Sequence, residues 1–257
     1  MATTVSDGGR DPDRYRSAQR GLTRLLVRDV RGLRRFMISS RLRTSVPDWI
    51  AAMQAVIDQY ARTSAALGAE FYDGQREAAG VAGTFTVPVA DPPPDGQTES
   101  GLRWAMKDVW EREPEQATEA QQQPLAMRLE QAAKKAELVA QKLVADTGRA
   151  TVIAAVQQDR QASAWARSAA LGACAFCKLI ASRGPVFKQD TVRFEAHDGC
   201  HCGVVPVFAG QRFEASPQAK EWARLYQEYA AGHSGSQLAR FRRALAEHDS
   251  NPLPGAF

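Results

Sequence analysis

Apolar side chains recur at spacings of three and four residues through most of the chain, the pattern of helices that bury one face. The first such run predicts a helix over residues 13–39. A second run predicts a long helix from an N-terminal cap at residues 45–48 to Arg76, with Pro47 in its first turn. Two long helices joined by a short connection indicate an antiparallel helical hairpin.

The helical pattern is interrupted once and then resumes. Residues 80–97 combine a short alternating segment with consecutive prolines, which predicts an extended excursion and a loop. Helices are then expected over residues 101–113, 118–146 and 150–170, with Gly148 near the division between the last two. This part of the chain should complete a helical bundle.

The pattern changes again toward the C-terminus. Short β-prone pieces at residues 185–187 and 204–208 lie around a group of cysteines. A Ser-Pro cap then begins a helix over residues 217–230, and a last helix is expected over residues 237–247. The cysteine segment is therefore the part of the chain that mixes short strands with helix.

The composition is that of a soluble globular protein: of 257 residues, 44% are hydrophobic and 24% are charged. No apolar stretch approaches the roughly 20 residues of a membrane-spanning helix, so no membrane association is expected. The N-terminal segment is polar and contains acids, unlike a secretory signal. We expect the chain to be made and kept in a reducing cytoplasm, or in an assembly built there.

Positive charge is concentrated near the N-terminus, where residues 14–43 contain ten arginines and one acid, Asp29. Seven of these arginines share one arc of the first predicted helix: Arg16, Arg20, Arg24, Arg28, Arg31, Arg34 and Arg35. Because so many like charges with almost no acidic partners repel one another, a polyanionic partner is one interpretation. A merely solvated helix face is the other. No interleaved aromatic residues indicate base stacking.

All four cysteines lie between residues 174 and 202. Cys174 and Cys177 form a CxxC pair, and after nineteen intervening residues His197, Cys200 and Cys202 form an HxxCxC run. Two close-spaced groups of thiolate and imidazole ligands are typical of a tetrahedral zinc site, and zinc suits a mixed Cys/His set. The sequence therefore predicts Zn²⁺ bound by residues of this set.

The spacing leaves open which four residues ligate the metal. We favour both members of the CxxC pair, with His197 and one or both of the last two cysteines. In an extended segment Cys200 and Cys202 share a face while His201 points away, which ranks His201 last. Because enough ligands are available to fill every coordination position, a closed structural site that joins two loops is favoured. Unliganded buried thiols are the alternative, whereas a redox CxxC is disfavoured because no βαβ pattern surrounds it.

A zinc-containing nucleic-acid-binding protein or nuclease is the alternative function. Small zinc-bearing nucleases use a histidine base beside a metal-bound phosphate, a role for which Glu195, Asp198 and His201 are candidates. A second CxxC pair and a dense His/Asn pair after the motif are missing. The sequence also lacks a glycine-rich phosphate loop and a GxSxG motif, and His233 and His248 are expected on the solvated surface. We therefore expect no enzymatic activity.

Together these features predict a mainly α fold, with a long N-terminal helical hairpin and helical bundle and a small C-terminal zinc-binding α+β module. Residues 1–12 are expected to be disordered and residues 13–170 to form the helical domain. The zinc-binding module should span residues 171–210, followed by C-terminal helices over residues 211–248 and a mobile tail at residues 249–257.

The cysteine segment resembles a known family, the Mu F-like minor head proteins of tailed bacteriophages in their actinobacteriophage form. The resemblance rests on AWARSAALGACAFCKLIASRGPVF followed by HDGCHCGVVPVF, which is similar to the CxxC…HxxCxC signature of that family. It extends to ALGAEFYDGQREAAGV and a later LRWAM, which resemble the N-terminal half of such proteins. The likeness covers most of the chain, residues 15–208, and departs at His201, where many relatives have arginine.

The resemblance implies a minor capsid or head-morphogenesis protein, present in multiple copies around the portal. Its expected place is the virion, in the head interior or at the portal vertex, and the host cytoplasm during assembly. The expected partners are the portal protein, the major capsid protein or both, with packaged DNA on the arginine face. Some members carry a fused protease or toxin domain, for which this chain has no room. The implied role is therefore mechanical, in head assembly or in DNA packaging and ejection.

Overall fold

The computed structural model describes residues 3–111, 113–188, 194, 196–197 and 199–249, and within them the fold is mainly helical, as predicted. The helices are α1 (Arg10–Gly32), α2 (Leu42–Ala78), α3 (Asp95–Ala105), α4 (Leu125–Gln158), α5 (Ala175–Ala181), α6 (Pro217–Tyr229) and α7 (Gln237–His248). The strands are β1 (Thr4–Val5), β2 (Ala162–Ser168), β3 (Phe187–Lys188), β4 (Gly203–Phe208) and β5 (Arg212–Phe213). None of the described helices is long and apolar enough to cross a bilayer.

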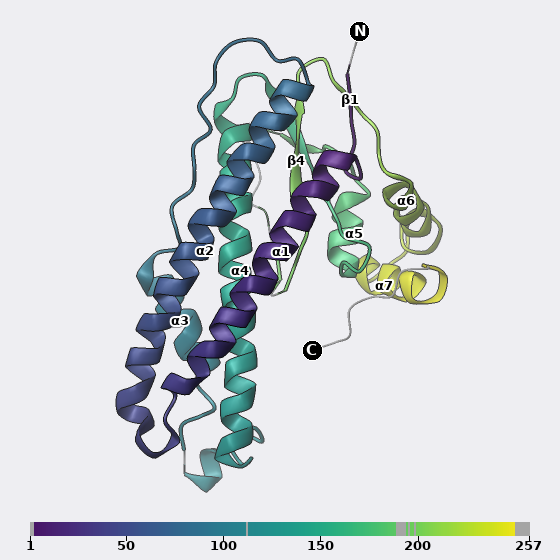
Figure 1. Ribbon diagram of the computed structural model, residues 1–257. Helices are drawn as coiled ribbons and strands as arrows, with labels where there is room; N and C mark the ends of the chain where they lie inside the picture. The colour runs from purple at the N-terminus through teal and green to yellow at the C-terminus, as the bar shows by residue number, and fades with distance from the viewer. Residues whose placement is uncertain (1–2, 112, 189–193, 195, 198, 250–257) are drawn as a thin grey trace.

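The long helices α1, α2 and α4 run side by side and form a rod, with α3 packed between α2 and α4 (Figure 1). The apolar faces that the periodicity predicted meet along its axis, where Leu26, Trp49, Met53 and Ala136 are fully or almost fully buried. After α2, residues 81–94 follow the rod without regular secondary structure and lead to α3. The extended excursion predicted there is confirmed.

The antiparallel hairpin of α1 and α2 is confirmed, but its turn lies earlier than predicted. α1 gives way to a 3₁₀ turn at Leu33–Phe36, and α2 begins at Leu42. The hydroxyl of Ser45 accepts a hydrogen bond from the backbone N–H of Ile38 at 3.1 Å, so it fastens the connection to α2. Ser45 therefore does not cap the helix, and Pro47 lies inside it.

The single helix α4 replaces two predicted helices that were to divide near Gly148. Gly148 lies at a close approach of α4 to α2, since a Cβ on it would be 2.5 Å from the Ser64 hydroxyl oxygen. A Cβ on Gly68 would be 2.7 Å from the carbonyl oxygen of Gly148. The glycine therefore permits two helix backbones to approach each other and does not end the helix.

Replacing Gly68 by alanine should lower the free energy of unfolding by about 1–3 kcal/mol, because the new Cβ overlaps a backbone carbonyl of α4. Gly74→Ala is the matched control in the same helix, since a Cβ there meets nothing within 4 Å. That change should raise the free energy of unfolding by up to about 1 kcal/mol through helix propensity. Urea denaturation should give opposite signs for the two variants. Two shifts of the same sign would contradict the close packing.

A three-stranded antiparallel sheet in the order β3–β2–β4 lies at one end of the rod. β2 corrects the helix predicted over residues 150–170. The consecutive strand residues Trp165 and Ala166 are both buried, although their side chains point to opposite faces of the sheet. The strand therefore lacks the alternation of apolar and polar residues by which a half-exposed strand is identified. The helix ends because the carboxylate of Asp159 accepts a hydrogen bond from the backbone N–H of Gln161 at 2.9 Å. Of the two predicted β-prone pieces, residues 204–208 are confirmed as β4, whereas residues 185–187 overlap β3 only at Phe187.

The N-terminal segment corrects the prediction that residues 1–12 are disordered, since β1 pairs in parallel with β5. The buried carboxylate of Asp7 accepts hydrogen bonds from the backbone N–H of Ser216 at 2.7 Å and from its hydroxyl at 2.8 Å. Ser216 in turn caps α6, as predicted, by accepting from the N–H of Ala219 at 3.1 Å. Periodicity could not reveal this contact because it joins residues 209 positions apart.

The helices α6 and α7 lie where the sequence predicted them and pack against α5. The fully buried ammonium of Lys178 on α5 forms an ion pair with Asp249 at 2.6 Å. The same carboxylate accepts a hydrogen bond from the indole N–H of Trp222 at 3.1 Å. Of the predicted mobile tail, Asp249 is held by these contacts, and residues 250–257 lie outside the described residues.

Candidate metal centre

The sheet brings the two halves of the cysteine motif together. β2 and β4 are antiparallel partners, so the C-terminal end of β2 lies opposite the N-terminal end of β4. Cys174 follows β2 after a short loop and precedes α5, which places Cys177 in the first turn of that helix. Cys200 and Cys202 directly precede β4. Strand pairing therefore places the CxxC pair beside the CxC pair.

A tight turn positions His197 at the same place. The backbone N–H of Cys200 donates to the carbonyl oxygen of His197 at 3.2 Å. Gly199 inside this turn has a φ of +71°, a left-handed conformation that glycine adopts without strain. The HxxCxC spacing thus corresponds to a turn followed by an extended pair of ligands.

The five predicted ligands form two overlapping groups. Cys174, Cys177 and His197 place their ligand atoms within 4.8 Å of one another, and so do Cys177, Cys200 and Cys202. The Sγ atoms of Cys177 and Cys200 are 3.7 Å apart. Tetrahedral coordination with Zn–S bonds of about 2.3 Å requires sulfur atoms about 3.8 Å apart. The donor set and this spacing fit a zinc ion, with Cys177 common to both groups.

Hydrogen bonds among the thiols lower the pKa of some of the cysteines and raise the pKa of others. The hydrogen bond from Cys177 is the main reason that the pKa of Cys174 falls to about 5. Hydrogen bonds from Cys177 and then Cys202 lower the pKa of Cys200. The pKa of Cys177 is raised, chiefly by its hydrogen bonds to Cys174 and Cys200. Cys174 and Cys200 are therefore favoured as thiolates, whereas neighbouring sulfur atoms and burial favour the protonated forms of Cys177 and Cys202, whose protons a cation would displace.

Two buried arginines hold this cluster, and sequence reasoning missed both. Arg149 of α4 donates from Nε to the carbonyl oxygen of Cys202 at 2.8 Å and from Nη2 to that of Cys200. Arg167 of β2 donates from Nη1 to the Sγ of Cys177 at 3.2 Å. A guanidinium group next to thiolates stabilises their negative charge and orients them. The sequence gives one signal for these arginines: each stands among otherwise buried positions of its helix or strand. Charged residues are rarely buried in this way.

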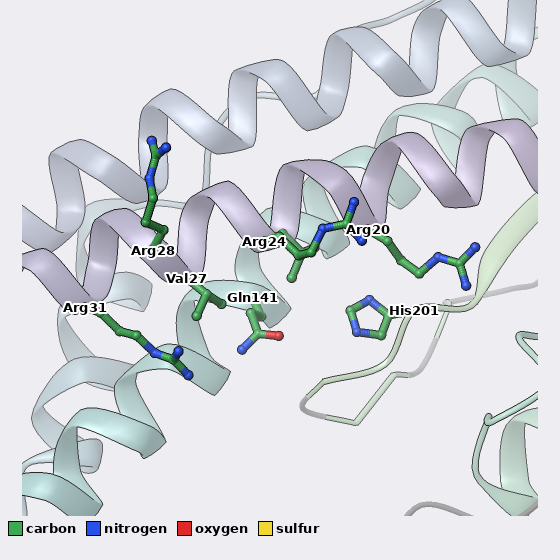
Figure 2. Close-up of a pocket in the computed structure, with 8 residues that line it drawn as sticks. Arg20, Arg24, Val27, Arg28, Arg31, Gln141 and His201 are labelled. Atoms are coloured by element: carbon green, nitrogen blue, oxygen red, sulfur yellow. The ribbon is translucent and has the colours of Figure 1, made fainter.

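His201, ranked last as a ligand, belongs to neither group. Its side chain lies on the side of the loop that faces α1 (Figure 2). There it lines a groove of about 570 Å³ between α1 and α4, and Arg20, Arg24 and Gln141 line the same groove. The loop before β4 therefore presents cysteines to one side and a histidine to the arginine face on the other.

The arginine face has more acidic partners than the sequence suggested, which corrects that expectation. The ion pairs are Arg16 with Asp13, Arg28 with Asp29 and Arg31 with Glu137. The last is bidentate, with Nε of Arg31 3.1 Å from both carboxylate oxygens of a residue on α4. Arg20, Arg24, Arg34 and Arg35 form no ion pair with any residue that the structure describes. These four arginines therefore lie in two places, Arg20 and Arg24 on α1 and the other two in the 3₁₀ turn that follows it.

Of the three residues considered for a nuclease, the structure describes one. Glu195 and Asp198 lie outside the described residues, and His201 faces the arginine groove. His233 and His248 are exposed, as expected, and the ring of His248 stacks on that of Tyr229 with centroids 4.6 Å apart.

Comparison with known proteins gives one family and one named relative. The family model for VG15 proteins matches residues 8–229. The Gene 15 protein of Mycobacterium phage D29 is 25% identical over 244 residues, which cover 80% of this chain and 83% of that protein. No solved structure matches the chain. The family match begins before α1 and ends with α6, so it includes the rod, the cysteine cluster and the arginine groove.

Proposed function

This chain belongs to the VG15 protein family, and we propose that it is a structural protein of a tailed-phage virion. The origin of its relative, a mycobacteriophage, supports this role. So does the architecture, in which a rod of long helices with a continuous apolar core is joined to a small cysteine-bearing module. Such a rod supplies stiffness and side surfaces for neighbours, and no turnover is required of it.

Within the virion, we propose a minor head protein of the Mu F-like kind, held in multiple copies near the portal. The observation that carries this proposal is the convergence of the CxxC and HxxCxC segments, which match the signature of those proteins, into one cluster of ligand atoms. The chain would contact the portal protein, the major capsid protein or both. It would act in head assembly, or in DNA packaging and ejection, after synthesis in the host cytoplasm.

The cysteine cluster would hold a structural zinc ion. Cys177 would be a ligand in either arrangement, joined by Cys200 and Cys202 from the loop before β4 and by Cys174 or His197. When bound, zinc supplies four-coordinate crosslinking between two segments that contribute little apolar surface of their own. The chain's own arginines prepare the site, because Arg149 holds the backbone carbonyls of Cys200 and Cys202 and Arg167 donates to the sulfur of Cys177.

The mechanism that follows is mechanical. Arg149 projects from α4 and binds the backbone of the metal loop, so that loop is fastened directly to the rod. Lys178 on α5 fastens the other half of the cluster to Trp222 of α6 through their shared partner Asp249. The cluster therefore lies at the junction of the rod, the sheet and the C-terminal helices, and a crosslink there would make the three parts rigid.

Purified particles of the phage that encodes this chain provide the test. We expect mass spectrometry of mature particles to detect the chain at a small fraction of the copy number of the major capsid protein. We expect an asymmetric cryo-EM reconstruction to show the helical rod at the portal vertex. Absence from mature particles would contradict a virion role. A position spread evenly over the capsid lattice would retain that role but contradict the association with the portal.

A further inference from the structure

The groove between α1 and the loop of Cys200 and Cys202 is lined mainly by arginine side chains. Four arginines line its α1 side, and Gln141 of α4 and His201 line the opposite side (Figure 2). Its arginines are Arg20, Arg24, Arg28 and Arg31. The side chains of Arg20 and Arg24 lie near the ring of His201, whereas Arg31 lies at the other end.

Among the described residues, acidic side chains neutralise the arginines at one end of this groove and not those at the other end. Arg28 and Arg31 are paired with Asp29 and Glu137, so their end of the groove is close to neutral. Arg20 donates one hydrogen bond to the Ser17 hydroxyl, and neither Arg20 nor Arg24 is paired with an acid in the described part of the chain. Two positive charges therefore remain at the end next to His201.

We propose that the end of the groove formed by Arg20, Arg24 and His201 binds phosphate groups of a duplex DNA backbone. Arg20 and Arg24 are one helical turn apart, about 6 Å along α1, so they can contact neighbouring phosphates of one strand. A guanidinium group binds a phosphate with two parallel N–H···O bonds, and an imidazole N–H adds another donor. This proposal gives a site to the DNA contact within the proposed virion function.

The lining of the groove favours a nucleic-acid backbone over an acidic protein. Protein interfaces depend on aromatic or large apolar anchors at their centre, and Val27 is the one apolar residue among those that line this groove. Contacts to the DNA backbone come from arginine, amide and hydroxyl side chains. The groove contains all three kinds, in Arg20 and Arg24, in Gln141 and in Thr23. No Phe, Tyr or Trp is among the described residues that line the groove, so it offers no platform on which unpaired bases could stack.

The position of His201 connects this site to the cysteine cluster. His201 lies between Cys200 and Cys202, whose carbonyl oxygens are both held by Arg149. The loop that carries the proposed metal ligands therefore also fixes where the imidazole enters the groove. The contact needs only a ring N–H donor, which imidazole has in either protonation state.

The experiment measures binding of the full-length chain to a short fluorescein-labelled DNA duplex of mixed sequence, by anisotropy at several salt concentrations. R20Q/R24Q is expected to weaken binding about tenfold or more. The slope of log K against log salt should fall by about 0.9 for each lost phosphate contact. R34Q/R35Q is the matched control, because it removes the same charge from unpaired arginines of the same segment outside the groove. It should change affinity by less than about threefold.

Each of the other possible results supports or overturns a part of the proposal. Equal weakening by the two double variants would overturn the site in favour of diffuse attraction, and so would an unchanged R20Q/R24Q. No binding of DNA by the unaltered chain, or equally effective competition by polyglutamate, would overturn the DNA assignment. H201A should weaken binding while retaining bound metal, and an unchanged affinity would remove His201 from the site. Metal content is measured separately, so loss of the zinc proposal would leave the arginine result intact.

Discussion

Replacing Cys177 by serine is expected to abolish metal binding and to lower the free energy of unfolding by more than about 4 kcal/mol. Cys177 is the one residue common to both groups of potential ligands in the described structure, so no neighbour can take its place in either arrangement. The purified unaltered chain should hold about one zinc ion per chain. Elemental analysis measures the metal, and thermal unfolding with and without a strong chelator measures its contribution to stability.

The control separates loss of the metal from damage to the loop. His201→Ala changes the residue between two of the proposed ligands but removes none of them, so it should retain zinc and melt close to the unaltered chain. A chain that is purified without metal and melts at the same temperature in chelator would contradict the zinc proposal. Its membership of the VG15 family would not be affected.

Replacing Asp249 by asparagine should lower the free energy of unfolding by about 3–5 kcal/mol, because the fully buried ammonium of Lys178 loses the carboxylate with which it forms an ion pair. The indole N–H of Trp222 also donates to this carboxylate, so the contact between α5 and α6 weakens with it. Urea denaturation followed by tryptophan fluorescence measures the change, since Trp222 lies at the site.

Two further variants test whether burial causes this cost. Lys220→Met breaks an ion pair with Glu214 in which both side chains are 59% exposed, and it should cost less than about 1 kcal/mol. The double variant Lys178→Met/Asp249→Leu removes both buried charges, so it should cost less than Asp249→Asn alone. Equal effects for the buried and exposed pairs would contradict this account.

The helices were the most predictable part of the fold because each buries one face. The spacing of apolar residues along the chain identifies that face. The boundaries were less predictable because tertiary contacts decide them. Gly148 looked like a division between helices, yet its role depends on α2, whose contacting residues lie some eighty positions earlier in the chain. β2 was taken for helix because burial on both faces removes the alternation that identifies a strand.

The candidate site was predictable in its ligands and not in its surroundings. The spacing of the cysteines selected the residues that the fold brings together. Arg149 and Arg167 could not be chosen, because their partners are defined by strand pairing and by the crossing of α4 behind the loop. The arginine face was misjudged for the same reason, since Glu137 is 106 residues from Arg31 and neutralises it across two helices.

The pairing of β1 with β5, and of Asp7 with Ser216, has a consequence for the order of events on the ribosome. Residues near the N-terminus leave the exit tunnel early, but their partners emerge only after more than two hundred further residues have been joined. The helical hairpin forms from neighbouring segments and need not wait, because local contacts form faster than distant ones. The segment before α1 can therefore pair with residues 212–216 only after the helices of the rod have been synthesised.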